Sequence, residues 1–300
     1  MNNAPANPSY LGAFFAITAF SLWGVFPIYF KSVSALPPFE VLSHRVLWSV
    51  VLLAILLVLT RRTKEIIIVF CNRKLLGLLT LSALLITLNW LVFIWAVSNN
   101  MVLQSSLGYF INPLVSVALG VVFLKERLRR WQMVAVLTAL VGVGNLIFQS
   151  GSQPWIALTM AVSFGLYGLV RKVAEVRATV GLFVETLIVL PVALAYLIYV
   201  DVEGTGTFMR VSLNMDALLA FAGLMTATPL VLFALAAKRM RLGSLGFFQY
   251  IAPTGHFLLA VMVYDEPFST AHAITFGFIW LALAIYSADS VREIRKQRRG

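Results

Sequence analysis

A run of polar residues interrupts an apolar segment that is otherwise long enough to span a membrane. The residues from Gln104 to Leu114 read QSSLGYFINPL, with Asn112 and Pro113 near the end. A polar group without a partner in hydrocarbon costs several kcal/mol, so these side chains must face protein or a water-filled cavity. Pro113 cannot donate a hydrogen bond to the carbonyl of Tyr109, which leaves that acceptor free. Binding of a polar solute near the middle of the membrane is the chemistry that this segment predicts.

The proline pattern occurs twice in the chain, at an offset of 140 residues. GYFINP ends at Pro113, and the similar hexapeptide FQYIAP ends at Pro253. Each proline frees a carbonyl, that of Tyr109 or of Gln249, and each could act as a hinge. The alternative is that both prolines are packing kinks whose backbone groups bond to neighbouring helices. We favour the functional interpretation because both prolines stand in a polar and aromatic setting.

Ionisable residues inside the apolar segments form a second group of candidates. His256 follows the second proline motif on the same predicted helix, where it could bind substrate or carry a proton. Glu185 is the only acid well inside a predicted span, and Arg45, next to His44, is its counterpart at the same offset. A neutral imidazole bonded to a neighbour is the alternative for His256, and a structural role is the alternative for Glu185. For Arg45 we favour a structural ion pair with another group.

Aromatic residues within the predicted spans complete the set. Trp23 and Tyr167 each precede a glycine that would admit a ligand, and they occupy matched positions in the two halves. Asn89 is better explained by a hydrogen bond between helices. The predicted substrate cavity comprises Trp23, Asn89, Tyr109, Asn112, Pro113, Tyr167, Gln249, Tyr250, Pro253 and His256, and the candidates for proton or charge coupling are Glu185, His256, His44 and Arg45.

The composition places these residues in an integral membrane protein. The chain has 300 residues, of which 60% are hydrophobic and 12% are charged, whereas soluble proteins carry about 25% charged residues. Apolar runs of about 17–25 residues are long enough to span the bilayer. The fold class is therefore an all-α, polytopic membrane protein, with the segment from Glu65 to Asn72 on the membrane surface. Ten spanning helices are predicted, at 10–31, 38–60, 75–97, 101–124, 131–149, 154–171, 179–200, 215–237, 243–264 and 271–289.

The distribution of basic residues predicts the orientation. With both termini in the cytoplasm, all but three of the 23 Lys and Arg residues lie at the cytoplasmic face, as the positive-inside rule requires. The exceptions are Lys31, Arg45 and Arg210. The formal net charge of +11 is then a topology signal, and no basic, aromatic-rich domain indicates nucleic acid as a partner. The N-terminus lacks the basic region and cleavage site of a signal peptide, so we expect the first helix to be retained.

An odd number of helices in each half means that a duplicated unit inserts upside down. The predicted helices divide into five within residues 1–149 and five within residues 150–300. The fourth helix ends at an inner basic loop, while its counterpart, the ninth, ends at the outer acidic pair Asp265 and Glu266. Inverted repeats with interrupted helices are a recurring architecture of secondary transporters, with substrate held where the repeats meet. We therefore expect two inverted five-helix repeats.

Five motifs in the chain together resemble one family. They are HRVLW at 44–48, NWLVFIWAV at 89–97, SLGYFINP at 106–113, YGLVRK at 167–172 and LGFFQY at 245–250. With these motifs the chain resembles, over nearly its whole length, the RarD-type permeases of the EamA group in the drug/metabolite transporter (DMT) superfamily. The resemblance implies two EamA repeats, ten helices, a location in the bacterial inner (plasma) membrane, and transport of small molecules, often outward. It supplies no agreed set of site residues, so the candidates above rest on the residues themselves.

The predicted function is that of a secondary transporter of small organic metabolites or drugs, acting as an exporter by alternating access. The sequence contains no nucleotide-binding loop, so transport would use a gradient, of protons or another ion, or run downhill. A facilitative, channel-like permease or an uptake carrier is the alternative. An intramembrane enzyme is disfavoured because no catalytic motif occurs, and neither a cofactor nor a metal site is predicted. The expected partners are the substrate and membrane lipids, and the oligomeric state, monomer or dimer, stays open.

Overall fold

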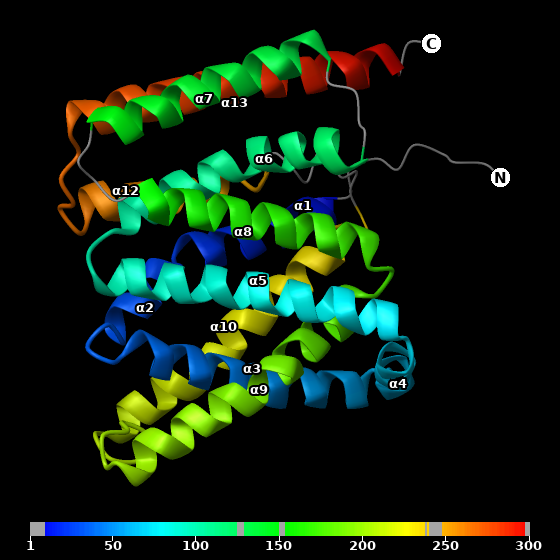
Figure 1. The fold of residues 1–300 in the computed structure, drawn as a ribbon, viewed down its shortest axis with the longest axis vertical. Coiled ribbons are helices and arrows are strands. Elements are labelled where there is room, and N and C mark those ends of the chain that lie inside the picture. The colour runs from blue at the N-terminus through cyan, green and yellow to red at the C-terminus, as the bar shows by residue number, and fades with distance from the viewer. Residues whose placement is uncertain (1–9, 125–128, 150–153, 238, 240–247, 298–300) are drawn as a thin grey trace.

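The computed structural model describes residues 10–124, 129–149, 154–237, 239 and 248–297, which form helices and no strand. Most of the helices run side by side in one bundle (Figure 1). A helix pairs its backbone groups within itself, which suits apolar segments of this length to hydrocarbon. The helices are α1 (Tyr10–Gly24), α2 (Phe26–Ser32), α3 (Pro38–Leu59), α4 (Thr63–Cys71), α5 (Arg73–Ser98), α6 (Val102–Leu124), α7 (Arg130–Gln149), α8 (Pro154–Val173), α9 (Ala178–Val202), α10 (Leu213–Ala237), α12 (Ile251–Met262) and α13 (Thr270–Gln297).

Within the described residues, six segments are long and apolar enough to cross a membrane. They are Leu11–Ser32, Pro38–Leu59, Arg73–Ser98, Ala178–Val202, Leu213–Phe233 and Thr270–Asp289. Shorter apolar helices cover Arg130–Gly142, Trp155–Arg171 and Ile251–Met262. The all-helical, multi-pass architecture expected from the composition is therefore confirmed, while the number of ten spans stays a prediction.

The first predicted span, 10–31, corresponds to the apolar segment Leu11–Ser32, but two helices form it instead of one. The helix is interrupted at Val25, which lies between the end of α1 at Gly24 and the start of α2 at Phe26. Pro27 lies at the start of α2 and has no N–H to donate to the carbonyl of Trp23, four residues earlier. The break therefore leaves the Trp23 carbonyl available to another group.

The ninth predicted helix, 243–264, also differs from the structure. Gln249 and Tyr250 form a turn, and α12 begins at Ile251, while residues 243–247 lie outside the described part of the chain. Pro253 is thus in the first turn of α12, where a missing N–H leaves no helical bond unmade. Position 113, in contrast, lies within the continuous helix α6, and the side chain of Pro113 is outside the described part.

The helices pack so that segments distant in the sequence lie side by side. In Figure 1, α7 and α13 form a pair at one edge of the bundle, and α3, α9 and α10 lie toward the opposite edge. Helix α6 packs on α8 and α12, α5 packs on α8, and α1 packs on α10 and α12. The central helices that carry most of the candidate residues are therefore in direct contact.

Two glycines let the central helices approach closely. A Cβ added to Gly108 of α6 would lie 2.8 Å from the carbonyl oxygen of Ala157 in α8. A Cβ added to Gly255 of α12 would lie 2.9 Å from the carbonyl oxygen of Gly24 in α1. These contacts fix the backbone immediately before Tyr109 and His256, and so they position two of the candidate side chains.

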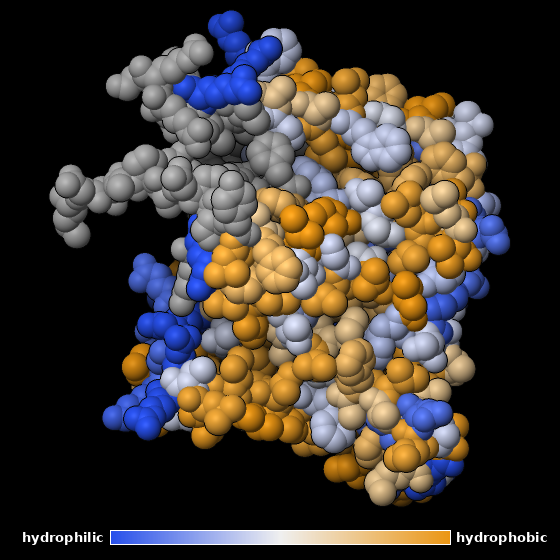
Figure 2. All heavy atoms as spheres, turned by 180° about the vertical axis from the view of Figure 1, so that it is seen from behind, coloured by the Kyte–Doolittle hydropathy of each residue, from blue (hydrophilic) through white to orange (hydrophobic). Residues whose placement is uncertain are grey.

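The outer surface of the bundle is largely apolar. In Figure 2, hydrophobic residues cover much of the visible face and hydrophilic residues gather toward its margins. Exposed apolar side chains include Val51 and Ile55 of α3 and Leu81 and Leu84 of α5. An exposed apolar face of this extent suits lipid, in agreement with the composition.

The segment expected on the membrane surface forms a separate short helix, α4. Its Ile67 and Ile68 side chains are exposed, while Val69 is buried against the bundle. The side chain of Asn72 accepts a hydrogen bond of 3.0 Å from the backbone N–H of Leu75 and so caps the start of α5. The separate helix is compatible with an interfacial position, which stays a prediction.

Candidate functional site

Asn89 of α5 joins three helices at the centre of the bundle. The side chain is buried, and its Nδ2 donates to the carbonyl oxygen of Met160, at 3.0 Å, and to Oγ of Ser163, at 3.1 Å. Its Oδ1 accepts from the hydroxyl of Tyr109 at 3.4 Å. The helix-to-helix bond considered from the sequence is therefore present, and the same amide also orients the Tyr109 hydroxyl.

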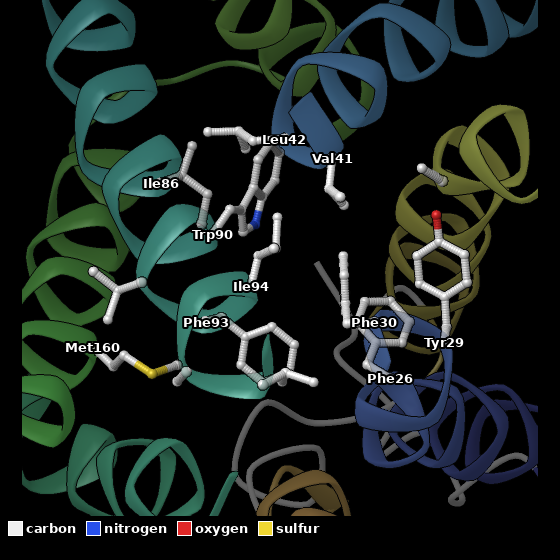
Figure 3. Packing of buried hydrophobic residues seen from close by; sticks show 14 of the residues in the cluster. Phe26, Tyr29, Phe30, Val41, Leu42, Ile86, Trp90, Phe93, Ile94 and Met160 are labelled. Carbon is white, nitrogen blue, oxygen red and sulfur yellow. The ribbon is translucent and has the colours of Figure 1, made fainter. Parts of the chain in front are cut away.

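Tyr109 and His256 are neighbours in an aromatic cluster. Their ring centroids are 5.6 Å apart, and the His256 ring stacks on Phe93 at 5.3 Å. Phe164 of α8 lies edge-on to Tyr109 at 6.2 Å. The cluster brings together side chains from α5, α6, α8 and α12, so it joins the two halves of the sequence. Figure 3 shows Phe93, a member of this cluster, and Met160 among the packed hydrophobic residues of the core.

His256 bonds to the carbonyl that the helix break leaves free. Its Nε2 is 2.8 Å from the carbonyl oxygen of Trp23. Because a carbonyl only accepts, Nε2 must carry the proton, and Nδ1 is then an acceptor. Nδ1 is buried without a hydrogen-bond partner among the described residues. This geometry fits the neutral imidazole considered from the sequence, and it leaves one acceptor for a further donor.

The polar run at the start of α6 is mostly engaged with protein. Ser106 Oγ donates to the carbonyl oxygen of Pro253 at 2.8 Å, and Gln104 Nε2 is 3.1 Å from Nε2 of His272. Within the described part, Oδ1 of Asn112 and Oε1 of Gln104 are buried without a partner. The run therefore ties α6 to α12 and α13 and retains two unpaired acceptors.

The remaining cavity candidates are spread around this centre. Trp23 packs against Phe20 and Phe233, with ring centroids 5.2 and 6.0 Å away. Gln249 is exposed and Tyr250 is half-buried, both in the turn before α12. The structure thus brings Trp23, Asn89, Tyr109 and His256 into one connected group through the contacts above, and it places Gln249 at the edge.

Glu185 and Tyr167 belong to a second polar group near the α8–α9 connection. The Glu185 side chain is fully buried; its Oε1 is 3.4 Å from Nη1 of Arg171, and its Oε2 accepts from the Tyr167 hydroxyl at 3.4 Å. Ser82 Oγ of α5 donates to the same carboxylate. Tyr167, which was expected in the substrate cavity, therefore donates its hydroxyl hydrogen bond to Glu185. Rings connect this group to the centre, because Phe164 lies between Tyr167 and Tyr109.

Arg45 and His44 point to different surroundings. The Arg45 guanidinium lies 4.1 Å from the ring centroid of Trp90, and its Nε donates to Oγ1 of Thr226 at 3.0 Å. The structural ion pair that the sequence favoured for Arg45 is wrong for the described residues, where no carboxylate lies within 4.0 Å of it. His44 lies 5.0 Å from Phe208 in the α9–α10 connection, and both of its ring nitrogens are buried without a partner among described groups.

Several contributors to these groups were not predicted from the sequence. They are Pro27, Ser82, Trp90, Arg171 and Thr226. Arg171 could have been found, because it stands four residues after Tyr167 and therefore on the same face of one helix. Pro27 also carries a visible signal, since a proline inside an apolar run frees the carbonyl four residues earlier. Ser82 and Thr226 are recognisable only once α5, α9 and α10 are placed beside α3.

Comparison with known proteins agrees with this membrane architecture. The sequence profile described as the EamA-like transporter family matches residues 10–148. The chain is 48% identical to an uncharacterized transporter of Vibrio cholerae, over 96% of this chain and 95% of that protein. It is 44% identical to protein RarD of Escherichia coli, over 95% of this chain and 96% of that protein. A protein of known crystal structure shares the fold, with a TM-score of 0.60 and 20% identity, covering 94% of this chain and 98% of that one.

Proposed function

We propose a function for this chain from one established premise: it belongs to the EamA-like transporter family and is a RarD-type permease. In this proposal the protein is a secondary transporter of small organic solutes in the inner membrane. It works as an exporter, by alternating access, and it needs no nucleotide. The observation that carries the proposal is the connected group of Asn89, Tyr109 and His256 at the contact of α5, α6 and α12, in which Nδ1 of His256 has no partner among the described residues.

The helix packing supports an inverted repeat of residues 1–149 and 150–300. Helix α3 packs on α9, α6 packs on α12, and α7 packs on α13. In each pair, one helix comes from the first half of the chain and the other is its counterpart five spans later. A two-fold axis in the membrane plane would bring together such counterparts, and substrate sites of inverted-repeat transporters lie along that axis. The α6–α12 contact is the pair that carries the central polar group.

The positions of the connections support an orientation with both termini in the cytoplasm. In Figure 1, α4, the α8–α9 connection and the C-terminal end of α13 lie at one side of the bundle. Arg61, Arg62, Arg73, Arg177 and Arg295 belong to that side, which the positive-inside rule assigns to the cytoplasm. The α9–α10 and α12–α13 connections lie at the opposite side.

The Glu185 group supports coupling to protons. A carboxylate that is fully buried in a span and paired with Arg171 resembles the proton relays of membrane pumps and transporters. Protonation would remove the attraction to Arg171 while the hydroxyls of Ser82 and Tyr167 could still bond to the carboxyl. In the proposed cycle, this change of charge is what links a proton gradient to the movement of α8 relative to α9.

Transport itself is tested by extracellular metabolites and reconstituted protein. Cells that overexpress the protein should accumulate a solute in the medium that deletion cells retain. Purified protein in proteoliposomes should then exchange that solute by counterflow, with a rate that saturates as its concentration rises. Flux that never saturates would favour the channel-like alternative, and inward accumulation under the physiological proton gradient would favour an uptake carrier. No solute difference and no flux would overturn the proposed function.

A further inference from the structure

Arg45 is a buried cation without an acidic partner among the described residues. Only 5% of its surface is exposed, although it lies inside a segment that is long and apolar enough to span the membrane. An arginine keeps its charge in proteins, and charged side chains within a span normally pair with each other or line a functional pathway. Packing alone therefore does not explain why the charged Arg45 side chain is buried at this position.

The buried acids of the described chain are all committed to other partners. Glu40 accepts from the backbone N–H of Thr207, at 2.7 Å, and from the hydroxyl of the same residue, at 3.1 Å. Glu185 is held by Arg171. Glu266 accepts from the first two N–H groups of α6, and Asp289 pairs with Arg129. None of these four carboxylates is left to neutralise Arg45.

The contacts of Arg45 fix its plane and leave its outer nitrogens unused. Three rings surround the guanidinium carbon, with centroids at 4.1 Å for Trp90, 5.5 Å for Phe30 and 6.0 Å for Phe26. Thr226 accepts from Nε only. The two terminal nitrogens make no hydrogen bond within the described residues, and neither is fully enclosed by protein. Two parallel N–H donors thus stay available in the geometry that a carboxylate binds best.

The three rings nearest the guanidinium belong to buried side chains of the hydrophobic core. Figure 3 shows Trp90 of α5 on one side and Phe30 and Phe26 of α2 on the other, with Ile94 of α5 and Val41 of α3 between them in this view. Val41 stands one helical turn before Arg45 on the same face of α3. Aromatic faces stack with flat apolar groups and also tolerate the guanidinium, but they cannot cancel its charge.

We propose that Arg45 is the anion-binding centre of the transport site, and that the substrate is an organic carboxylate with a flat, apolar body. The carboxylate accepts from both terminal nitrogens of Arg45, and the body lies among Trp90, Phe30 and Phe26. Thr226 is a positioning residue that holds the guanidinium plane. This assignment names the substrate class of the proposed transporter. It rests on the proposed transport function, because without transport an anion would have no route to this buried site.

Binding to the purified, full-length protein in detergent tests the assignment with three matched probes. Phenylacetate carries the anion, 2-phenylacetamide is its neutral analogue, and phenethylamine carries a cation on a similar body. Thermal stabilisation at increasing probe concentration yields an apparent affinity for each. Because only phenylacetate can form a charge-assisted hydrogen-bonded pair with Arg45, we expect it to bind about 10- to 100-fold more tightly than the amide. Equal affinity for all three probes would overturn the proposal.

Substitutions then test whether Arg45 causes the preference for phenylacetate over the amide. Arg45→Met should abolish the preference for phenylacetate, while Arg210→Gln, which removes an exposed arginine paired with Asp201, should leave it unchanged. Thr226→Val keeps the side-chain shape and removes the acceptor of Nε, so it should weaken phenylacetate binding several-fold with little effect on the amide. If Arg45→Met does not fold, the wild-type preference and the Thr226→Val result decide. A preference that survives in Arg45→Met, or in Thr226→Val at full strength, would overturn the assignment.

Flux measurements separate this inference from the proposed function. Wild-type proteoliposomes loaded with labelled phenylacetate should show saturable counterflow. Anion-selective binding without flux of any probe would count against the transport function and leave the Arg45 site standing. Saturable flux of the amide or amine at the same rate as phenylacetate would keep the transport function and overturn the anion site.

Discussion

Replacement of Glu185 by glutamine isolates the charge of the second polar group. The Glu185 side chain is fully buried, whereas that of Arg171 is 15% exposed, and Nη1 and Oε1 are 3.4 Å apart. Glutamine preserves the shape and one acceptor but leaves Arg171 without an anion. Loss of one partner from a buried ion pair costs about 3–5 kcal/mol. Because Arg171 lies near the end of α8 and can reach toward water, we expect the lower end, about 3 kcal/mol, for Glu185→Gln.

A double-mutant cycle measures whether the two charges act as a pair. The free energies of unfolding of wild type, Glu185→Gln, Arg171→Gln and the double variant would be obtained by denaturant titration in detergent micelles. The double variant should lose less than the sum of the single losses, with a coupling energy of about 1–3 kcal/mol. The exposed pair of Arg210 and Asp201 is the matched control, for which about 0–1 kcal/mol is expected. Additive losses at Glu185 and Arg171 would refute the reasoning.

The same variant separates a proton-linked role from a structural one. If Glu185 carries a proton during the cycle, Glu185→Gln should abolish accumulation driven by a pH gradient and spare counterflow exchange, which needs no net proton movement. Both rates would be measured in the same proteoliposomes, normalised to the amount of inserted protein. A variant that retains full gradient-driven accumulation would make Glu185 structural, and His256 would become the next candidate.

Three further changes test the topology, a helix cap and a helix crossing. Exposed Cys71 should react with a membrane-impermeant maleimide only after permeabilisation, and labelling of intact cells would contradict the orientation. Glu266→Gln removes the charge that caps the first two N–H groups of α6, both at 2.7 Å, and should lower the free energy of unfolding by about 1 kcal/mol; an unchanged value would deny the cap. Gly108→Ala should lower the free energy of unfolding by about 1–3 kcal/mol, because the added methyl group overpacks against α8. Gly77→Ala is the control, since there is open space around its Cβ position, and it should not lower the free energy of unfolding. Equal effects of the two substitutions would contradict the close crossing.

The sequence predicted the parts of the fold that depend on composition and period. Apolar length placed α3, α5 and α9 within a few residues of their bounds, because hydrocarbon admits few alternatives to a helix. The family resemblance is confirmed by the matching profile and by relatives over nearly the whole chain. The inverted repeat, the orientation and the direction of transport stay predictions.

Side-chain partners were harder to predict, because they depend on how helices pack. Arg171 looked like one more cytoplasmic charge, yet it reaches back to a buried carboxylate on the next helix. Arg45 looked like half of an ion pair, yet its neighbours are rings. Hydropathy reports which segments enter the membrane and says nothing about the rotation of each helix about its axis. That rotation decides which side chains meet.

The hydrogen bonds between the two halves set a condition on any alternating-access motion. His256 donates to the Trp23 carbonyl, and Ser106 donates to the Pro253 carbonyl, so both bonds cross between residues 1–149 and 150–300. Movement of α12 away from α1 has to break the first bond, and Pro27 prevents the Trp23 carbonyl from finding a helical donor instead. An unpaired carbonyl in hydrocarbon is costly. The halves can therefore separate at low cost only when water or a solute replaces His256, and a solute that donates a hydrogen bond to Trp23 would ease the very step that moves it.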